Sequence, residues 1–231
     1  ICKIVISCIS GYLLEESYEK NKINRLKNFI NYDESQPKIE SEIINENEFI
    51  ELRHIHSKED MYYYLVYHIN SQYIFLMKKF THTENLSENI KHEIEFCDKY
   101  YNRCFVKFYG FLKNNYSENK IGLIYEYVSN GDLKTFIENN NEKITPLFSF
   151  MTMNRIFQGI LYLYSNSLIH CDLKPSNILL DHDYTPYISD NETIREFFYI
   201  QDKYFKNIGS MSYSTPEQLS GNMISLYSDV F

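Results

Sequence analysis

The sequence lacks the features that mark several common classes of protein. Its five cysteines are odd in number and never have C-x-x-C spacing, which argues against a disulfide framework and against a zinc site. The formal net charge is −8, so we expect no surface for nucleic acid and no attraction to an anionic membrane. A reducing, cytoplasmic setting is the simplest interpretation of this cysteine usage.

No apolar run is long enough to span a bilayer. The most apolar stretch near the start, residues 4–14, is too short for a transmembrane helix and is followed by Glu15 and Glu16. We interpret this stretch as a structural segment, and the core of a signal peptide is the alternative. No membrane partner is therefore expected.

Glycine and proline are scarce, with seven and five residues, and no linker rich in either divides the chain. Residues 15–47 are polar, acidic and rich in Asn and Lys, so we predict that residues 1–48 form an N-terminal extension or linker. With 44% hydrophobic and 23% charged residues, the chain has the composition of a folded domain. The predicted domain covers residues 49–231.

Short segments rich in aromatic residues dominate the first half of this domain. Strands are predicted at residues 61–67, 73–77, 105–112 and 121–128. Between the second and third of these, residues 86–101 have a helical period, with Ser87 as the N-cap. The apolar stripe of this helix is formed by Ile90, Ile94, Cys97 and Tyr101.

Helical patterns dominate the second half. Asp132 is placed to cap a short helix, and Thr145-Pro146 is typical of the start of a longer one. The apolar stripe of the longer helix is formed by Met151, Ile156, Ile160 and Leu163. Strands followed by helices predict an α+β domain, with a strand-rich part at 49–128 and a helical part at 129–231.

The most informative segment is residues 170–180, which read HCDLKPSNILL. This segment resembles the catalytic loop H-R-D-L-K-P-x-N of eukaryotic protein kinases, with Cys171 in place of the arginine. Taken singly, Asp172 could cap a turn, Lys174 could be a solvated charge and Asn177 could satisfy loop backbone groups. Their fixed spacing before the predicted strand 178–180 favours the catalytic loop.

The resemblance implies a role for each polar residue of this loop. Asp172 would orient the acceptor hydroxyl and accept its proton, and Lys174 would reach the transferring phosphate. Asn177 would bind the second Mg²⁺, a cation that prefers oxygen ligands. The Lys174-Pro175 pair is similar to that of serine/threonine kinases rather than tyrosine kinases.

Other landmarks of the kinase family follow in the expected order. Residues 75–78, FLMK, resemble the strand whose lysine holds the α- and β-phosphates of ATP, so Lys78 would have this role. Glu93, in the helix that follows, would form an ion pair with Lys78. Adjacent Lys79 and Glu95 are the alternative alignments.

Three further landmarks follow, and the first two complete the implied nucleotide site. Residues 123–128 resemble the strand that leads into the hinge, where backbone groups of Glu126 and Val128 would contact adenine and Tyr125 would be the gatekeeper. Asp190 would be the primary Mg²⁺ ligand, at the aspartate of the D-F-G motif, and residues 214–217 resemble the A-P-E segment. The metal ligands would thus be Asn177 and Asp190.

The sequence also departs from the family pattern. The glycine-rich loop should lie over residues 56–63, yet His56, Lys58 and Met61 occupy its glycine positions. Tyr63 and Leu76 stand where kinases have smaller residues over the adenine ring. The D-F-G motif reads D-N-E at residues 190–192. Because Cys171 replaces the arginine, activation by a phosphorylated loop is not expected.

The resemblance implies a two-lobed, α+β, protein-kinase-like fold with a β-rich N-lobe and a helical C-lobe. The C-lobe is expected to be incomplete, because residues 226–231 resemble the entry to its central helix and the sequence stops there. The resemblance implies that Asp229 holds the backbone of the catalytic loop. The implied function is ATP- and Mg²⁺-dependent phosphorylation of Ser/Thr in a protein substrate. The alternatives are a pseudokinase that binds partners without catalysis and a remnant that does not fold.

Overall fold

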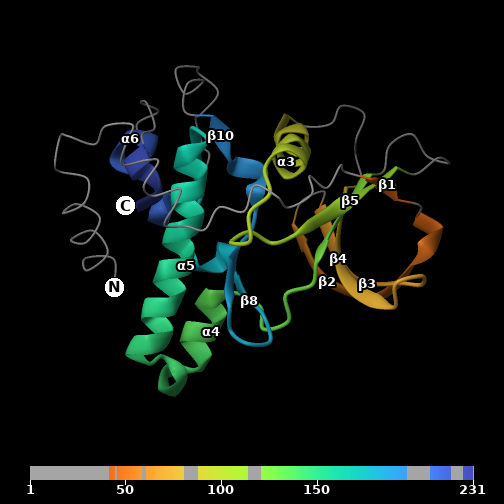
Figure 1. Ribbon diagram of the computed structural model, residues 1–231, viewed down its shortest axis with the longest axis horizontal. Helices are drawn as coiled ribbons and strands as arrows, with labels where there is room; N and C mark the ends of the chain where they lie inside the picture. Colours follow the sequence, from red (N-terminus) through yellow and green to blue (C-terminus); the bar gives the residue numbers. More distant parts are fainter. Residues whose placement is uncertain are drawn as a thin grey trace.

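A sheet with one helix beside it and a group of helices form the two sides of the molecule (Figure 1). The computed structural model describes residues 42–44, 46–58, 61–80, 88–113, 121–196, 209–219 and 226–230. Most of the predicted N-terminal extension, Ser87 and residues 59–60 lie outside these residues. The described part has the predicted α+β architecture, with a β-rich N-lobe and helices in the C-lobe.

The N-lobe is built around a six-stranded sheet in the order β1-β5-β6-β4-β3-β2. Its strands are β1 (Glu42–Ile44), β2 (Phe49–Lys58), β3 (Met61–His68), β4 (Tyr73–Phe80), β5 (Phe108–Lys113) and β6 (Ile121–Glu126). A short 3₁₀ helix, η1 (Glu46–Glu48), precedes β2. All neighbours are antiparallel except β1 and β5.

The register of the central strands places the key lysine in the middle of the sheet. Lys78 on β4 lies opposite Tyr63 on β3 and opposite Leu123 on β6. Antiparallel pairing brings directly opposed side chains close together on one face of the sheet. Tyr63 is therefore a neighbour of Lys78.

Helix α3 (Glu88–Lys99) packs on the sheet through Ile90, while its buried Phe96 belongs to the core of the C-lobe. The apolar cluster beneath it also contains Phe80 and Leu123. The prediction that Tyr101 belongs to the buried stripe is wrong. The helix ends at Lys99, so Tyr101 leaves the helical period and its side chain is 40% exposed.

The two predicted helix caps of the C-lobe are confirmed. The Asp132 carboxylate accepts a hydrogen bond from the Thr135 amide at the start of α4 (Leu133–Asn139). The Thr145 hydroxyl accepts one from the Phe148 amide at the start of α5 (Pro146–Ser165). Both contacts satisfy amides that the first turn of a helix leaves unpaired.

Helix α5 supplies much of the C-lobe core through Ile156, Ile160 and Leu163, as predicted. The prediction that Met151 belongs to the same stripe is wrong, because its side chain lies on the outer face of the helix and is 59% exposed. Three shorter helices are η2 (Asn141–Lys143), α6 (Pro216–Leu219) and η8 (Leu226–Val230).

Two small two-stranded sheets carry the polar loops between the lobes. Strand β8 (Ile178–Leu180) pairs with β9 (Pro186–Ile188), and β7 (Leu168–Ile169) pairs with β10 (Arg195–Glu196). The 3₁₀ helices η3 (Pro175–Asn177), η4 (Asn191–Thr193) and η7 (Met211–Tyr213) complete this region.

Backbone hydrogen bonds connect β9 to the segment that leads into the sheet. The Ile188 amide donates to the Cys104 carbonyl at 2.8 Å, and the Val106 amide donates to the Ile188 carbonyl at 2.9 Å. The predicted strand 105–112 therefore begins later, at Phe108, because Phe105 and Val106 pair with β9 instead of with the sheet. Within the described ranges, no helix is both long and apolar enough to cross a membrane.

Helix α5 approaches β9 closely at Gly159. A Cβ atom built at Gly159 would overlap the Ile188 Cδ1 atom and lie 3.2 Å from the Cys104 Cβ atom. Glycine in a helix costs about 1 kcal/mol relative to alanine, so its presence here reflects this close contact.

We predict that Gly159→Ala destabilises the folded protein by about 1–3 kcal/mol, because overpacking outweighs the gain in helix propensity. Ile188→Val removes the overlapping methyl group, and alone it should cost roughly 0.5–1.5 kcal/mol. Chemical denaturation of both single variants and the double variant tests this. Additive effects of the two substitutions would contradict the proposed contact.

Candidate active site

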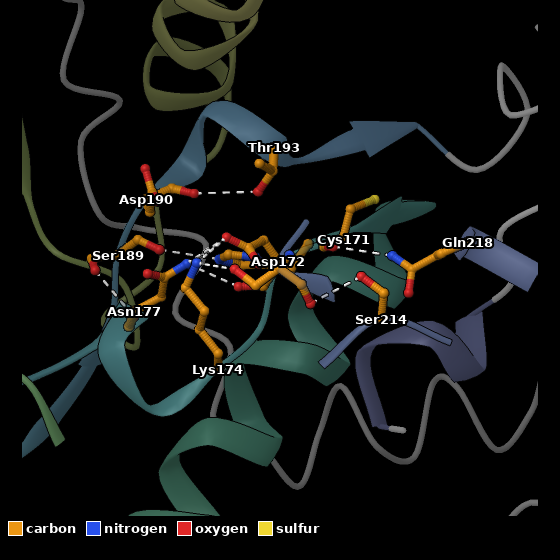
Figure 2. Close-up of polar contacts among 11 residues, drawn as sticks. Cys171, Asp172, Lys174, Asn177, Ser189, Asp190, Thr193, Ser214 and Gln218 are labelled. Carbon is orange, nitrogen blue, oxygen red and sulfur yellow. Dashed lines mark hydrogen bonds and ion pairs between the residues drawn. The ribbon is translucent and has the colours of Figure 1, made fainter. Parts of the chain in front are cut away.

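Asp172 lies at the centre of a network of hydrogen bonds between β7 and η3 (Figure 2). Its Oδ2 atom accepts from Lys174 Nζ at 2.5 Å and from the Asn177 side-chain amide at 3.2 Å. Its Oδ1 atom accepts from the Ser210 amide at 2.8 Å. The structure thus brings together Asp172, Lys174 and Asn177, the three polar residues that the sequence singled out in this loop.

Ser210 is a site residue that the sequence analysis missed. Its hydroxyl oxygen lies 2.5 Å from Lys174 Nζ, so both its backbone and its side chain contact the centre. The available signal was its position just before the segment predicted to resemble A-P-E. Neighbouring Gly209 has φ +95, and a Cβ there would lie 2.7 Å from the Cys171 carbonyl oxygen, so this approach requires glycine.

The backbone of the catalytic loop is held by residues that come later in the chain. The Asp229 carboxylate accepts from the amides of His170 at 2.8 Å and Cys171 at 2.9 Å, as the sequence predicted for this aspartate. The Gln218 side chain donates to the Cys171 carbonyl at 3.1 Å. Cys171 has φ 68, a strained value for a residue that is not glycine, and these bonds hold it there.

The Cys171 side chain is buried and is no substitute for an arginine charge. Burial raises the pKa of its thiol well above the usual range, so the side chain stays neutral at physiological pH. Its thiol lies 3.7 Å from the Ile169 carbonyl oxygen. Cys171 therefore fills space behind the loop.

Asn177, at the end of η3 just before β8, and Asp190, at the start of η4 just after β9, are linked through Ser189. The Ser189 amide and hydroxyl both donate to the Asn177 carbonyl, at 2.9 and 3.0 Å. The Asn177 side-chain nitrogen donates to the Asp172 carbonyl at 2.9 Å, which turns the amide oxygen away from that carbonyl. Asp190 follows in the left-handed conformation, with φ 65.

This pair of residues fits a hard divalent cation, since it offers one carboxylate and one amide oxygen. In the part of the chain that the structure describes, no group of three or more His, Cys, Asp or Glu side chains is arranged to hold a metal. A cation here would therefore take its other ligands from phosphate and water, as Mg²⁺ does at phosphoryl-transfer sites.

Lys78 forms the second polar cluster, on the N-lobe side. Its Nζ atom lies 2.8 Å from Glu93 Oε2 and 3.0 Å from Glu192 Oε2. Burial alone would lower the pKa of Lys78, but the charge of Glu93, together with that of Glu192, holds it well above the usual range. The ammonium group is therefore charged although the residue is only 3% exposed.

The alternative alignments do not reach this cluster. Lys79 pairs with Glu51 at 2.9 Å and with Glu46 at 3.4 Å, and the Glu95 side chain is 74% exposed. Lys78 and Glu93 are thus the pair that the fold brings together.

Tyr125 locks the orientation of Glu93. Its hydroxyl donates to Glu93 Oε1 at 2.6 Å, while the other carboxylate oxygen accepts from Lys78. Burial raises the pKa of Tyr125 well above its usual range, which keeps the hydroxyl protonated. The predicted gatekeeper therefore acts on helix α3, a contact that sequence reasoning did not foresee.

Tyr63 occupies the place in β3 where the sequence predicted an oversized residue. Burial raises its pKa to about 12, and the charges of Lys78 and Asp190 also act on its hydroxyl. Its position opposite His56 confirms that the residues aligned with the glycine-rich loop lie in the β2–β3 hairpin. Residues 59–60, between β2 and β3, lie outside the described residues.

The predicted hinge connects the sheet to the C-lobe. The Glu126 amide donates to the Lys107 carbonyl at 2.8 Å and is therefore already paired. The predicted adenine contact of Glu126 thus depends on its backbone carbonyl. Val128 is buried against the cluster under α3. Beyond it, the Asn130 amide donates to the Leu180 carbonyl, which fixes the hinge against β8.

Comparison with known proteins places these features in one family. Residues 61–231 match the family model described as "Protein kinase domain". Three plant proteins illustrate the similarity, and the aligned part spans only 14 to 21% of their lengths.

The first, "G-type lectin S-receptor-like serine/threonine-protein kinase SRK" of Arabidopsis thaliana, is 38% identical over 126 residues, which is 50% of this chain and 14% of the relative. The second, "Cysteine-rich receptor-like protein kinase 6" of Oryza sativa subsp. japonica, is 35% identical over 149 residues, 62% and 21% of the two chains. The third, "Receptor-like serine/threonine-protein kinase SD1-8" of A. thaliana, is 40% identical over 118 residues, 47% and 14%.

His170 supplies a pH-dependent test of the loop. The residue is fully buried, its Nε2 atom lies 3.1 Å from the Ser189 carbonyl oxygen, and burial lowers the pKa of the imidazole. The folded protein thus holds His170 neutral, while the unfolded chain binds a proton near pH 6.5. The resulting stability is complete above about pH 6.5 and is lost as the pH falls toward the lower folded pKa.

We predict that His170→Gln, which keeps an N–H donor but does not titrate, removes this dependence. Below about pH 6.5 the unmodified protein should lose up to about 1.4 kcal/mol per pH unit relative to the variant. Urea denaturation between pH 7.5 and 5 measures the difference. His182→Gln is the control, because that side chain is 80% exposed. Parallel curves for the unmodified protein and His170→Gln would contradict the prediction.

Proposed function

The chain belongs to the protein kinase domain family, and from this premise we propose that it transfers the γ-phosphate of ATP to Ser/Thr hydroxyls of a protein substrate. The observation that carries the proposal is the network around Asp172, in which a carboxylate, an ammonium group and an amide converge within hydrogen-bonding distance. Phosphoryl transfer needs these groups, because it depends on positioning and charge stabilisation.

In this proposal Asp172 is the residue that contacts the acceptor hydroxyl. Its buried carboxylate is oriented by three donors, from Lys174, Asn177 and Ser210. It orients the hydroxyl and accepts its proton as the phosphate is transferred. Lys174 places its positive charge beside this carboxylate and reaches the transferring phosphate.

We propose Asn177 and Asp190 as the Mg²⁺ ligands and Lys78 as the residue that holds the α- and β-phosphates. Bound Mg²⁺ would neutralise the charge of the phosphate oxygens. Glu93 orients Lys78 through the 2.8 Å ion pair, and the hinge at Glu126 and Val128 is the proposed contact for adenine. Each of these groups positions the nucleotide.

We propose the substrate class from two relatives that are named as serine/threonine-protein kinases. We further propose that the catalytic domain covers residues 49–231 and that residues 1–48 are an extension. A reducing, cytoplasmic setting is supported by Cys97, Cys104 and Cys171, which are free thiols.

A second candidate is a nucleotide-binding pseudokinase without transfer activity. The observation in its favour is that Glu192 pairs with Lys78, the residue proposed to hold phosphate. The residues His56, Lys58 and Met61, which take the places of glycines, also favour weak binding of nucleotide phosphates.

We predict that Asp172→Asn lowers phosphotransfer by about 10²-fold or more and leaves ATP binding nearly unchanged, because the base is lost while the nucleotide contacts remain. Lys78→Met should weaken both. Radiolabelled phosphate transfer and equilibrium nucleotide binding measure the two effects. Asp183→Asn is the control, because that side chain is 75% exposed.

Each outcome separates the candidates. Full transfer by Asp172→Asn in a contaminant-free assay would contradict the assignment of the catalytic loop. Nucleotide binding without transfer in the unmodified protein would favour the pseudokinase.

A further inference from the structure

Lys78 is shared between two carboxylates that come from different parts of the chain. Glu93 lies on α3, and Glu192 lies on η4, after β9. The Glu192 contact, at 3.0 Å, is nearly as short as the Glu93 contact at 2.8 Å. The buried Lys78 ammonium group thus forms two ion pairs, one with Glu93 and one with Glu192.

The segment that carries Glu192 is anchored on both sides of it. Asn191 is buried and donates to Cys97 Sγ on α3 at 3.7 Å. The Arg195 guanidinium donates to the Glu192 carbonyl at 2.6 Å and to the Ile194 carbonyl at 2.8 Å. The Asn191 contact therefore links this segment to α3, and the Arg195 contacts stabilise the turn itself. The Glu192 side chain extends from this turn to Lys78.

The two carboxylates differ in how firmly they are held. The Glu93 side chain is 3% exposed and accepts a second hydrogen bond from the Tyr125 hydroxyl at 2.6 Å. The Glu192 side chain is 15% exposed, and the contact described for its carboxylate is the one with Lys78. A ligand that needs Lys78 would therefore displace Glu192 and leave Glu93 in place.

The charges around Lys78 allow another anion to bind there only if it replaces a carboxylate that is already present. Glu93, Glu192 and Asp190 all act electrostatically on the lysine. A phosphate added beside them would bring further negative charge into a partly buried site, where like charges repel strongly. If Glu192 leaves, a phosphate can take its place without increasing the number of anions on Lys78.

We propose that the Glu192 carboxylate occupies the place of a nucleotide phosphate on Lys78 and makes the site discriminate against polyphosphates relative to the bare nucleoside. This inference rests on the nucleotide site of the proposed function. Glu192 is a specificity-determining residue in this view: ADP and ATP must displace its carboxylate, whereas adenosine binds at the hinge without contacting it.

A different role for Glu192 predicts the opposite change in nucleotide affinity when the residue is replaced. As a cation ligand beside Asp190, Glu192 would strengthen the binding of nucleotide–Mg²⁺, and its removal would weaken that binding. The observed pairing with Lys78 favours displacement, because it puts the carboxylate on the group that binds phosphate.

The test is equilibrium binding of ADP and of adenosine, by calorimetry, to the unmodified protein, Glu192→Gln and Glu192→Ala, each with EDTA and with Mg²⁺. Removal of the competing charge should tighten ADP binding roughly tenfold or more in both buffers and leave adenosine binding unchanged. Glu95→Gln is the matched control: it removes the same charge from the solvent-exposed face of α3 and should change neither affinity. A thermal melt of each variant establishes that it is folded.

The outcomes separate the two levels of the proposal. Equal ADP affinity in the unmodified protein and both Glu192 variants would overturn the competition between Glu192 and phosphate. Binding of adenosine in the same experiment would still support the nucleotide site. If the Glu192 variants bound ADP more weakly than the unmodified protein, and only in the buffer with Mg²⁺, the competition would be contradicted and Glu192 would be a cation ligand. Failure of every folded protein to bind either ligand would overturn the nucleotide site itself, and the competition with it.

Discussion

The polar architecture depends on the burial of one positive charge. Lys78 lies in the middle strand of the N-lobe sheet and is 3% exposed, so its ammonium group must be compensated by nearby carboxylates. Those carboxylates come from α3 and from η4, which lie far apart in the sequence. One ion-paired centre thus ties together the sheet, the helix beside it and the segment that carries Asp190.

A second constraint acts on the C-lobe side, where the backbone of the catalytic loop is strained. Cys171 has a positive φ, and its amide and carbonyl are held by Asp229 and Gln218, which come 58 and 47 residues later. The carboxylate of Asp229 is buried, and burial raises its pKa, so the two amide donors repay part of that cost. The geometry around Asp172 therefore depends on residues near the end of the chain.

Local signals in the sequence predicted much of the fold. The Asp132 and Thr145 caps, and the strands around Lys78, follow from patterns within a few residues. The errors lie at element boundaries: Tyr101 falls just past the end of α3, and periodicity alone does not show where a helix stops. Asp172, Lys174 and Asn177 could be singled out together because their spacing is itself local, and the structure brings their side chains into contact. The Lys78–Glu192 contact joins residues 114 positions apart, and no pattern in the sequence encodes such a distance.

The conformation of residues 190–192 explains how a carboxylate fits where the family pattern has glycine. In the described backbone, the positive φ of this segment falls on Asp190, and Glu192 lies in an ordinary 3₁₀ turn. Position 192 therefore does not require glycine for its backbone, and any side chain that fits the space is allowed. The space beside it contains the Lys78 ammonium group, which a carboxylate stabilises. Glu192 thus costs the fold little, and what it changes is the charge around the Lys78 ammonium group.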